Sequence, residues 1–467
     1  MMKKTIIALA LVLLATAPVT AQVDFTRYVA LGDSLTAGFA SGSLMDWYQE
    51  RSYPAVLAHQ GGAPVFELPT VSQPGIGPIL ELVALFQNGE LIPTIAPVGL
   101  LPGLPSNAEY PGIYNNLGIP AATLYDMLFQ TGDINNLLQG NFETVMFDIV
   151  LRNGINTALE QAIGAQPTFV TVWIGSNDVL GAVLAGTPID GVTMTPVLSF
   201  SELYQNAIGA LATNTPADIV LLNLPSPTEI PFTTSVPPFV DIEGLGRWYY
   251  VADTGPLTDD DRLTSLASAL IAQGYGLPGG PPLPDNLNLL TGEPGVVLRA
   301  AEIDVIEDRI EAYNSIIADV GSAFGAPVFD AYGFFDGITS GDELPEFGGV
   351  TLTADFLLGG IFSFDGIHPQ NIGHGVLANE LVLFLNEVFD DSIPEVNMAN
   401  VLFEGDWQDP GVVPTKASDV VFSYEAFDQV WQIFKPKIQR RLSVRRGGSV
   451  RVPVHDEVRS RPNLDKK

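Results

Sequence analysis

Short apolar runs alternate with helix-patterned segments along most of the chain. Four short, mostly apolar runs predict buried strands, and they cover residues 28–31, 168–174, 218–224 and 327–329. Between them, apolar residues recur at helical spacing over residues 200–211 and 303–320, and a last helix is expected over residues 375–389. Strands that alternate with helices indicate an α/β fold in which a mostly parallel sheet is covered on both faces.

The first 21 residues have the pattern of a signal peptide. Lys3 and Lys4 precede an uncharged apolar run over residues 5–15, and small residues ending at Ala21 suit a signal peptidase. We therefore expect cleavage after Ala21 and export, so that the protein is periplasmic or secreted in a bacterium; an uncleaved N-terminal anchor is the alternative. The chain has no cysteine, which excludes disulfides, thiolate metal sites and a cysteine nucleophile.

Two long Pro- and Gly-rich stretches interrupt the predicted core domain, which covers residues 22–395. They run over about residues 68–114 and 225–294, and loops of that length without structure are uncommon in compact domains. We expect insertions with structure of their own, one of which could cover the site as a lid. Residues 396–434 are expected to form a small C-terminal appendage, and the basic segment 435–467 is expected to be disordered.

Charge separates this tail from the body of the chain. The formal net charge is -32 at pH 7, yet the residues from Lys435 onward include eleven Lys and Arg against three Asp and Glu. The part between the signal segment and the tail therefore carries about -42. A surface this acidic repels polyanions, so nucleic acid is not expected as a partner. The basic tail could instead contact an anionic membrane or envelope polymer at the periphery of the cell.

Three short islands carry the candidate chemistry. They are Gly32-Asp33-Ser34-Leu35, Gly175-Ser176-Asn177-Asp178 and Asp365-Gly366-Ile367-His368-Pro369. Together they supply a hydroxyl nucleophile, an amide donor, and a histidine three residues after a carboxylate, which is what acyl transfer to water requires. The first two follow predicted strands, and the carboxyl ends of strands in an open α/β sheet share the edge where ligands bind.

His368 is the best candidate for the base that activates the serine. Of the four histidines, only His368 has an acidic partner, Asp365, in a compact turn. His59 is expected at a helix end, His374 near the start of the last helix, and His455 in the basic tail. A carboxylate that accepts the Nδ1 proton fixes the tautomer, so that Nε2 can take the serine proton.

Each candidate also has a structural interpretation. Asp33 or Ser34 could cap a following helix, and Asn177 could close an Asx turn after its strand. Asp178 is expected to be structural or to start a helix.

The islands resemble blocks I, III and V of the GDSL, or SGNH, hydrolase superfamily, and the resemblance covers about residues 25–390. It implies a three-layer α/β/α sandwich with a flavodoxin-like sheet. It also implies that Ser34 is the nucleophile, His368 the base and Asp365 its partner, with Asn177 and the Ser34 backbone N–H as oxyanion donors. No cofactor and no metal are implied. The chain is most similar to exported bacterial members with long insertions.

Block II is the departure from this family pattern. Residues 116–123 match it in spacing, but Ala121 stands where the family usually has the glycine whose N–H donates to the oxyanion. Alanine keeps that N–H, although its Cβ is unfavourable if the site needs a positive φ. Gly118 in a shifted register is the alternative donor.

The predicted function is serine-dependent hydrolysis of carboxylic esters, of the lipase or esterase type, through an acyl-enzyme. The expected substrate is a small-molecule or lipid ester. A carbohydrate O-deacetylase would use the same triad, with Trp47 and Tyr48 stacking on sugar rings, and a non-catalytic envelope or carbohydrate-binding protein is a further alternative. A metallophosphoesterase would need several histidines around two metals, and this chain has four in all. No oligomeric state is predicted.

Overall fold

The computed structural model describes residues 22–87, 90–99, 101–403 and 420–436. The expected signal peptide and nearly all of the basic tail lie outside these residues. Five parallel strands form the central sheet, in the order β15-β8-β7-β1-β4. These strands are β1 (Tyr28–Gly32), β4 (Asn116–Gly118), β7 (Phe169–Trp173), β8 (Asp218–Leu222) and β15 (Val328–Phe329).

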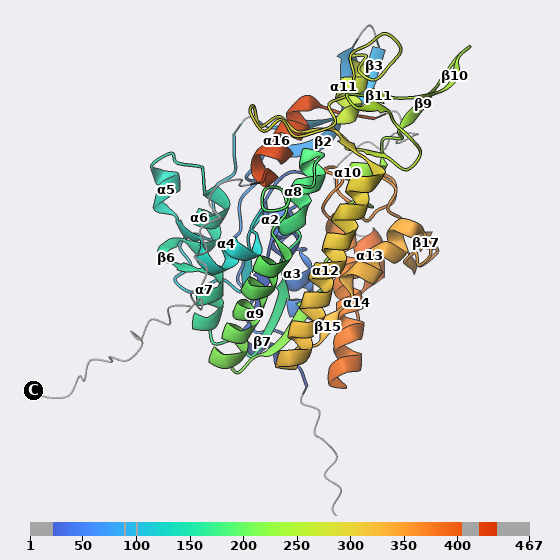
Figure 1. Cartoon of the computed structure of the whole chain (residues 1–467). Coiled ribbons are helices and arrows are strands. Elements are labelled where there is room, and N and C mark those ends of the chain that lie inside the picture. Colours follow the sequence, from blue (N-terminus) through green and yellow to red (C-terminus); the bar gives the residue numbers. More distant parts are fainter. Residues whose placement is uncertain (1–21, 88–89, 100, 404–419, 437–467) are drawn as a thin grey trace, which may run out of the picture.

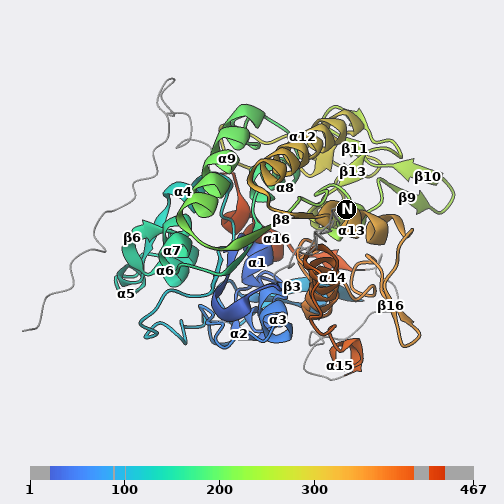
Figure 2. The same ribbon diagram turned by 90° about the horizontal axis from the view of Figure 1, so that it is seen from below.

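Helices cover both faces of this sheet, which makes the three-layer α/β/α sandwich that was expected. Seen from below, α8, α9 and α12 lie on one side and α3 and α14 on the other (Figure 2). Their bounds are α3 (Tyr53–Gln60), α8 (Asn177–Ala185), α9 (Val197–Asn214), α12 (Ala300–Phe324) and α14 (Asn371–Phe389). The strands are buried on both faces, as a covered parallel sheet requires.

The remaining elements of the body are short. They are η1 (Phe25–Arg27), α1 (Ser34–Ala37), α2 (Asp46–Gln49), α4 (Leu124–Phe129), β5 (Thr131–Asp133), α5 (Asn135–Leu138), α6 (Val145–Leu151), β6 (Asn153–Thr157), α7 (Ala158–Gly164), α13 (Ala331–Ser340), β16 (Glu346–Phe347), β17 (Val350–Thr351) and α15 (Met398–Phe403).

Helix α14 begins at Asn371, four residues before the expected start at residue 375. The glycine at position 373 hid this start in the sequence, because glycine is a poor helix former. The structure explains that glycine: a Cβ there would lie 2.4 Å from the carbonyl oxygen of Ile361.

Helix α14 is also the one helix among the described residues that is long and apolar enough to cross a membrane. It has 19 residues, and 61% of its most apolar window is buried inside the protein. It packs on α3, so its apolar character is that of a core helix.

The first predicted insertion holds a β-hairpin that the C-terminal part of the chain extends. Strands β2 (Ile79–Gln87) and β3 (Glu90–Val98) pair antiparallel, and β18 (Val421–Phe422) pairs parallel with β3. Helix α16 (Tyr424–Phe434) follows β18 directly. Figure 1 shows the hairpin and α16 next to each other at the upper end of the molecule. Residues more than three hundred positions apart in the chain thus form one small sheet.

The second predicted insertion consists of small hairpins and two short helices. Its elements, with the strand that closes them, are α10 (Pro231–Thr234), β9 (Phe239–Ile242), β10 (Gly246–Tyr249), β11 (Val251–Ala252), β12 (Gly255–Pro256), β13 (Arg262–Leu263), α11 (Ala267–Ala272) and β14 (Val297–Leu298). The pairing of β13 with β14 ties the insertion to the segment just before α12.

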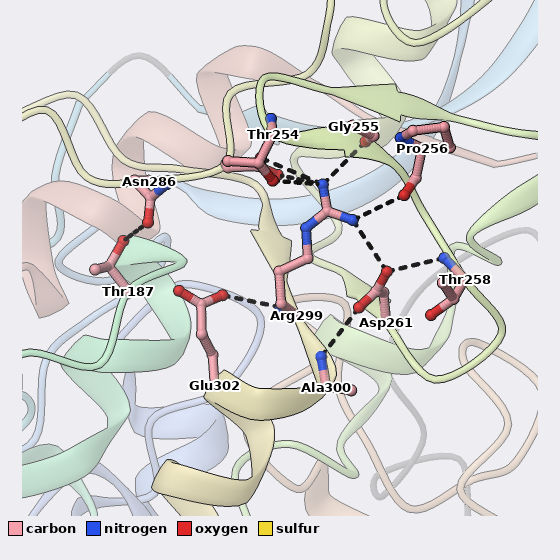
Figure 3. A network of polar contacts seen from close by, with 11 residues as sticks. Thr187, Thr254, Gly255, Pro256, Thr258, Asp261, Asn286, Arg299, Ala300 and Glu302 are labelled. Carbon is pink, nitrogen blue, oxygen red and sulfur yellow. Dashed lines mark hydrogen bonds and ion pairs between the residues drawn. The ribbon is translucent and has the colours of Figure 1, made fainter.

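Arg299, the residue between β14 and α12, binds several groups of the insertion at once (Figure 3). Its guanidinium lies 3.1 Å from the Asp261 carboxylate and 3.2 Å from that of Asp285, and it donates to the carbonyl oxygens of Gly255 and Pro256. Both carboxylates are buried. Because a buried carboxylate needs a cation or several donors, Arg299 holds these turns against the body.

Replacing Arg299 by leucine should lower the free energy of unfolding by about 3 to 5 kcal/mol, because two buried carboxylates would lose their cation. Arg247→Leu is the matched control: Arg247 lies 3.9 Å from Asp241 on the surface, both side chains are at least half exposed, and the expected loss is below about 1 kcal/mol. Urea unfolding of the two variants measures the difference. Equal losses would show that Arg299 does not have this role.

Candidate active site

Ser34, His368 and Asp365 form a hydrogen-bonded triad. The Ser34 Oγ lies 2.9 Å from His368 Nε2, and His368 Nδ1 lies 2.9 Å from Asp365 Oδ2. An ionised carboxylate only accepts, so Nδ1 carries the ring proton and Nε2 accepts from the serine hydroxyl. All three side chains are at most 3% exposed. Residues from the two ends of the fold therefore meet at one edge of the sheet.

Ser34 lies at the point where β1 ends and α1 begins. The cap of α1 is Asp33, whose Oδ1 accepts the N–H of Leu35 at 3.0 Å, so the Ser34 hydroxyl is not used as a cap. The Ser34 N–H belongs to the first turn, where helical N–H groups have no intrahelical acceptor. Gly32 allows α1 and the neighbouring strand β7 to lie close to the end of β1, because a Cβ there would lie 2.1 Å from Thr36 Oγ1 and 2.4 Å from the carbonyl oxygen of Trp173.

Asp365 is held by its own turn and by a neighbouring loop. Its Oδ1 accepts the N–H groups of Ile367 and His368 at 2.9 Å and the Ser363 hydroxyl at 3.0 Å, and its Oδ2 accepts the Gly42 N–H at 3.1 Å. Burial acts to raise the pKa of Asp365, but His368 and the N–H donors outweigh it and hold the pKa below its usual value. The carboxylate is therefore ionised, as a partner of the imidazole must be.

Asn177 opens α8 directly after β7 and reaches across to the loop of residues 116–123. Its Nδ2 donates to the carbonyl oxygen of Ala122 at 3.0 Å, so the side chain does not close an Asx turn of its own segment. A primary amide has two N–H bonds, and the second remains for a substrate oxygen.

Ala121 adopts φ = +61°, in the left-handed region that favours glycine. A glycine at this position would adopt this conformation without the strain that the alanine Cβ adds. The Gly118 N–H donates to Asn116 Oδ1 at 2.8 Å, which makes Gly118 unsuitable as the alternative oxyanion donor.

Asp33 and Asp178 lie near the hydrogen-bonded triad but are not part of it. Burial raises the pKa of Asp33 to about 7, while the Leu35 N–H and His368 act to lower it. Its Oδ2 has no hydrogen-bond partner in the described part of the chain. Asp178 accepts the N–H of Leu124 and the hydroxyl of Thr195, so it joins loops of the site, which is the structural role expected of it.

Two pockets meet at Asn177. The first is apolar, encloses about 560 Å³ that is partly open to solvent, and reaches Ser34 and His368. Its other lining residues are mostly apolar, among them Leu35, Val179, Leu180, Ile230, Phe335 and Phe362. The second pocket encloses about 810 Å³, also partly open, and is lined by Ala121, several hydroxyl side chains and the end of α16. We call them the apolar pocket and the hydroxyl-lined pocket.

The other histidines and the two aromatic candidates do not reach this site. His374 is buried behind it, and its Nδ1 accepts the Tyr53 N–H at 3.3 Å. His59 ends α3 and is exposed, and His455 lies outside the described residues. Tyr48 is fully buried, and Trp47 packs under the Arg51 guanidinium, so these aromatics form no open platform for a sugar ring. Over the described ranges, no three His, Asp or Glu side chains gather as metal ligands.

Three further residues of the site could not be recognised from the sequence. Ser363 donates to Asp365, and the rings of Phe39 and Phe434 lie 5.1 Å and 5.3 Å from the imidazole of His368. Phe434 could not have been assigned from the sequence, because nothing in α16 shows where in the fold that helix packs.

The family assignment follows from a comparison with family models. The model described as GDSL-like Lipase/Acylhydrolase matches residues 28–381, about three quarters of the chain. The chain belongs to this family. The matched part of this GDSL-like hydrolase contains all three islands and both predicted insertions.

Solved structures that are similar to this GDSL-like hydrolase share little sequence with it. An alpha/beta hydrolase enzyme from the metagenome of Lake Arreo is 12% identical, with 79% of this chain and 98% of that chain covered and a TM-score of 0.34. A protein from Lactobacillus plantarum is 16% identical, with 78% and 99% covered and a TM-score of 0.31. Phospholipase A1 from Streptomyces albidoflavus is 14% identical, with 77% and 98% covered and a TM-score of 0.31. No curated protein matches the chain.

Ala121→Gly should raise the free energy of unfolding by up to about 1 kcal/mol, since the roughly 1 to 2 kcal/mol cost of a left-handed alanine exceeds the added entropy of an unfolded glycine. The backbone N–H is kept, so ester turnover should stay within about twofold. Ala318→Gly, at an exposed position in the interior of α12, is the control and should lower the free energy of unfolding by about 1 kcal/mol. A loss of the same size in Ala121→Gly would contradict the strain that we infer.

His374 should make the protein sensitive to acid. Burial, and then repulsion by His368, lower its pKa to about 3, whereas an unfolded histidine titrates near 6.5. Between pH 6.5 and 3 the unfolded chain therefore binds a proton that the folded chain does not, and stability falls as the pH falls, by about 1.4 kcal/mol per pH unit from this group. His374→Gln should remove that part of the slope. Urea unfolding from pH 4 to pH 7 tests this, and parallel curves for the two proteins would contradict it.

Proposed function

We propose that this GDSL-like hydrolase hydrolyses carboxylic esters through an acyl-enzyme on Ser34. The observation that carries the proposal is the continuous hydrogen-bonded row from the Ser34 hydroxyl through His368 to an ionised Asp365. A serine hydroxyl is a weak nucleophile at neutral pH unless a base lies within hydrogen-bonding reach, and here one does.

The reaction would proceed in two steps. Ser34 Oγ attacks the ester carbonyl while His368 Nε2 takes its proton, and the negative oxygen is stabilised by the N–H groups of Ser34 and Ala121 and by the free N–H of Asn177. The tetrahedral species collapses, His368 returns the proton to the departing alcohol, and the acyl group stays on Ser34. Water then attacks the acyl-enzyme with His368 again as base, which releases the acid and restores the serine.

The apolar pocket supports an ester with a hydrocarbon acyl chain. It opens directly at Ser34 and His368, and few polar side chains line it besides the reacting ones. Burying each CH₂ of an acyl chain there contributes about 0.8 kcal/mol, which favours lipid-like over acetyl esters. The buried Tyr48 gives no support to a sugar-stacking deacetylase.

We also propose that the enzyme acts outside the cytoplasm, in the periplasm or secreted. Support for this comes from the sequence of residues 1–21 alone, with its two lysines, apolar run and small residues.

Ser34→Ala should lower kcat/KM for p-nitrophenyl esters by about 10³-fold or more and leave the melting temperature within a few degrees. Ser340→Ala, an exposed serine at the end of α13, is the matched control and should keep full activity. A Ser34→Ala enzyme within tenfold of the wild type would refute the proposal.

Asn177→Ala should lower kcat by about 10² to 10³ with a smaller change in KM, since its N–H acts mainly on the transition state.

A further inference from the structure

The C-terminal segment of residues 420–436 lies against the candidate active site. Gln429 of α16 donates from Nε2 to the carbonyl oxygens of Gly42 at 2.8 Å and Pro78 at 2.5 Å. Upstream, β18 pairs with β3, so the helix is held from two directions. Gly42 is also the residue whose N–H donates to Asp365. One loop thus links the C-terminal helix to the catalytic carboxylate.

The last turn of α16 places Phe434 on the imidazole. The Phe434 ring centroid lies 5.3 Å from that of His368 and 5.5 Å from that of Phe39, which is itself 5.1 Å from His368. Phe434 is only 6% exposed. The imidazole and the two phenylalanine rings therefore form a three-ring cluster in which each ring contacts the other two, and one ring comes from the loop after α1 and one from α16.

Phe434 also forms a wall of the hydroxyl-lined pocket, together with Lys435 and Pro436. Ala121 and Asn177, two of the proposed oxyanion donors, line the same pocket. The remaining lining includes the polar residues Thr123, Thr193, Thr195 and Ser199. This pocket is thus next to the reacting centre and differs in polarity from the apolar pocket.

An ester has two arms that leave the carbonyl carbon in different directions. With the carbonyl oxygen at Asn177, which borders both pockets, each pocket can take one arm. The acyl arm is a hydrocarbon and suits the apolar pocket, whereas the alcohol arm suits the pocket with hydroxyl groups.

We propose that Phe434 determines which alcohol arms the enzyme accepts, as the wall of the hydroxyl-lined pocket. The proposal rests on the ester hydrolysis proposed above. The C-terminal helix is in this sense part of the active site: its last aromatic ring limits the size of the leaving alcohol, while the apolar pocket limits the acyl chain.

Two ester series separate the arms. One keeps butyrate and enlarges the alcohol from methyl to hexyl and benzyl; the other keeps p-nitrophenol and lengthens the acyl chain from two to twelve carbons. Phe434→Ala should shift the ratio of kcat/KM between benzyl and methyl butyrate at least tenfold towards benzyl, because a ring-sized space opens. Its acyl-chain profile should stay within about threefold of the wild type.

Matched phenylalanine variants serve as controls. Phe427→Ala removes a buried ring of the same helix that lines neither pocket, so it controls for the loss of a buried phenylalanine and should leave both profiles unchanged. Phe335→Ala widens the apolar pocket and should shift the acyl series instead. Phe434→Leu should lie between the wild type and Phe434→Ala in the alcohol series.

Three results would overturn the proposal: an equal loss on every ester in Phe434→Ala, a shift confined to the acyl series, or the same alcohol shift in Phe427→Ala. Each is read against a wild type that hydrolyses the esters. A wild type inactive on both series would refute the proposed ester hydrolysis itself, which is a different outcome.

Discussion

The buried Asp365 carboxylate is the charge on which the arrangement of the site depends. A carboxylate removed from water costs several kcal/mol unless donors replace the water, and this one receives hydrogen bonds from its own turn, from Ser363, from Gly42 and from His368. Those donors belong to parts of the chain more than three hundred residues apart. Satisfying one anion therefore fixes the loop after β1, the turn before α14 and the imidazole between them, and the imidazole in turn orients Ser34.

Much of the sheet and the candidate triad could be predicted from the sequence. The strands β1, β7 and β8 were predicted to within about two residues, because their runs are mostly apolar, and the helical spacing predicted α9 and α12. Strand β4 was not predicted, since three residues without an apolar run give no signal. The candidate triad could be proposed because each member lies in a short local pattern, and parallel strands bring such patterns to one edge.

Other residues depend on packing between distant segments, and local patterns do not report it. The alanine at position 121 could be recognised as unusual, but its positive φ is visible only in the folded loop. Tyr48 was considered as a sugar platform and is buried instead, because burial depends on what packs against it. The strand pairing of β18 with β3 and the contact of Phe434 with His368 join segments that share no sequence feature, so only the structure places them.

Phe434 is synthesised long after Ser34, although both belong to the same site. Ser34 is among the first residues of the body to be synthesised, and Phe434 follows about 400 residues later. At roughly 5 to 20 residues per second, the ribosome needs on the order of half a minute to cover that interval. Throughout that interval, the growing polypeptide carries its future nucleophile without the ring that packs on the imidazole, so the site is completed only once Phe434 has been added.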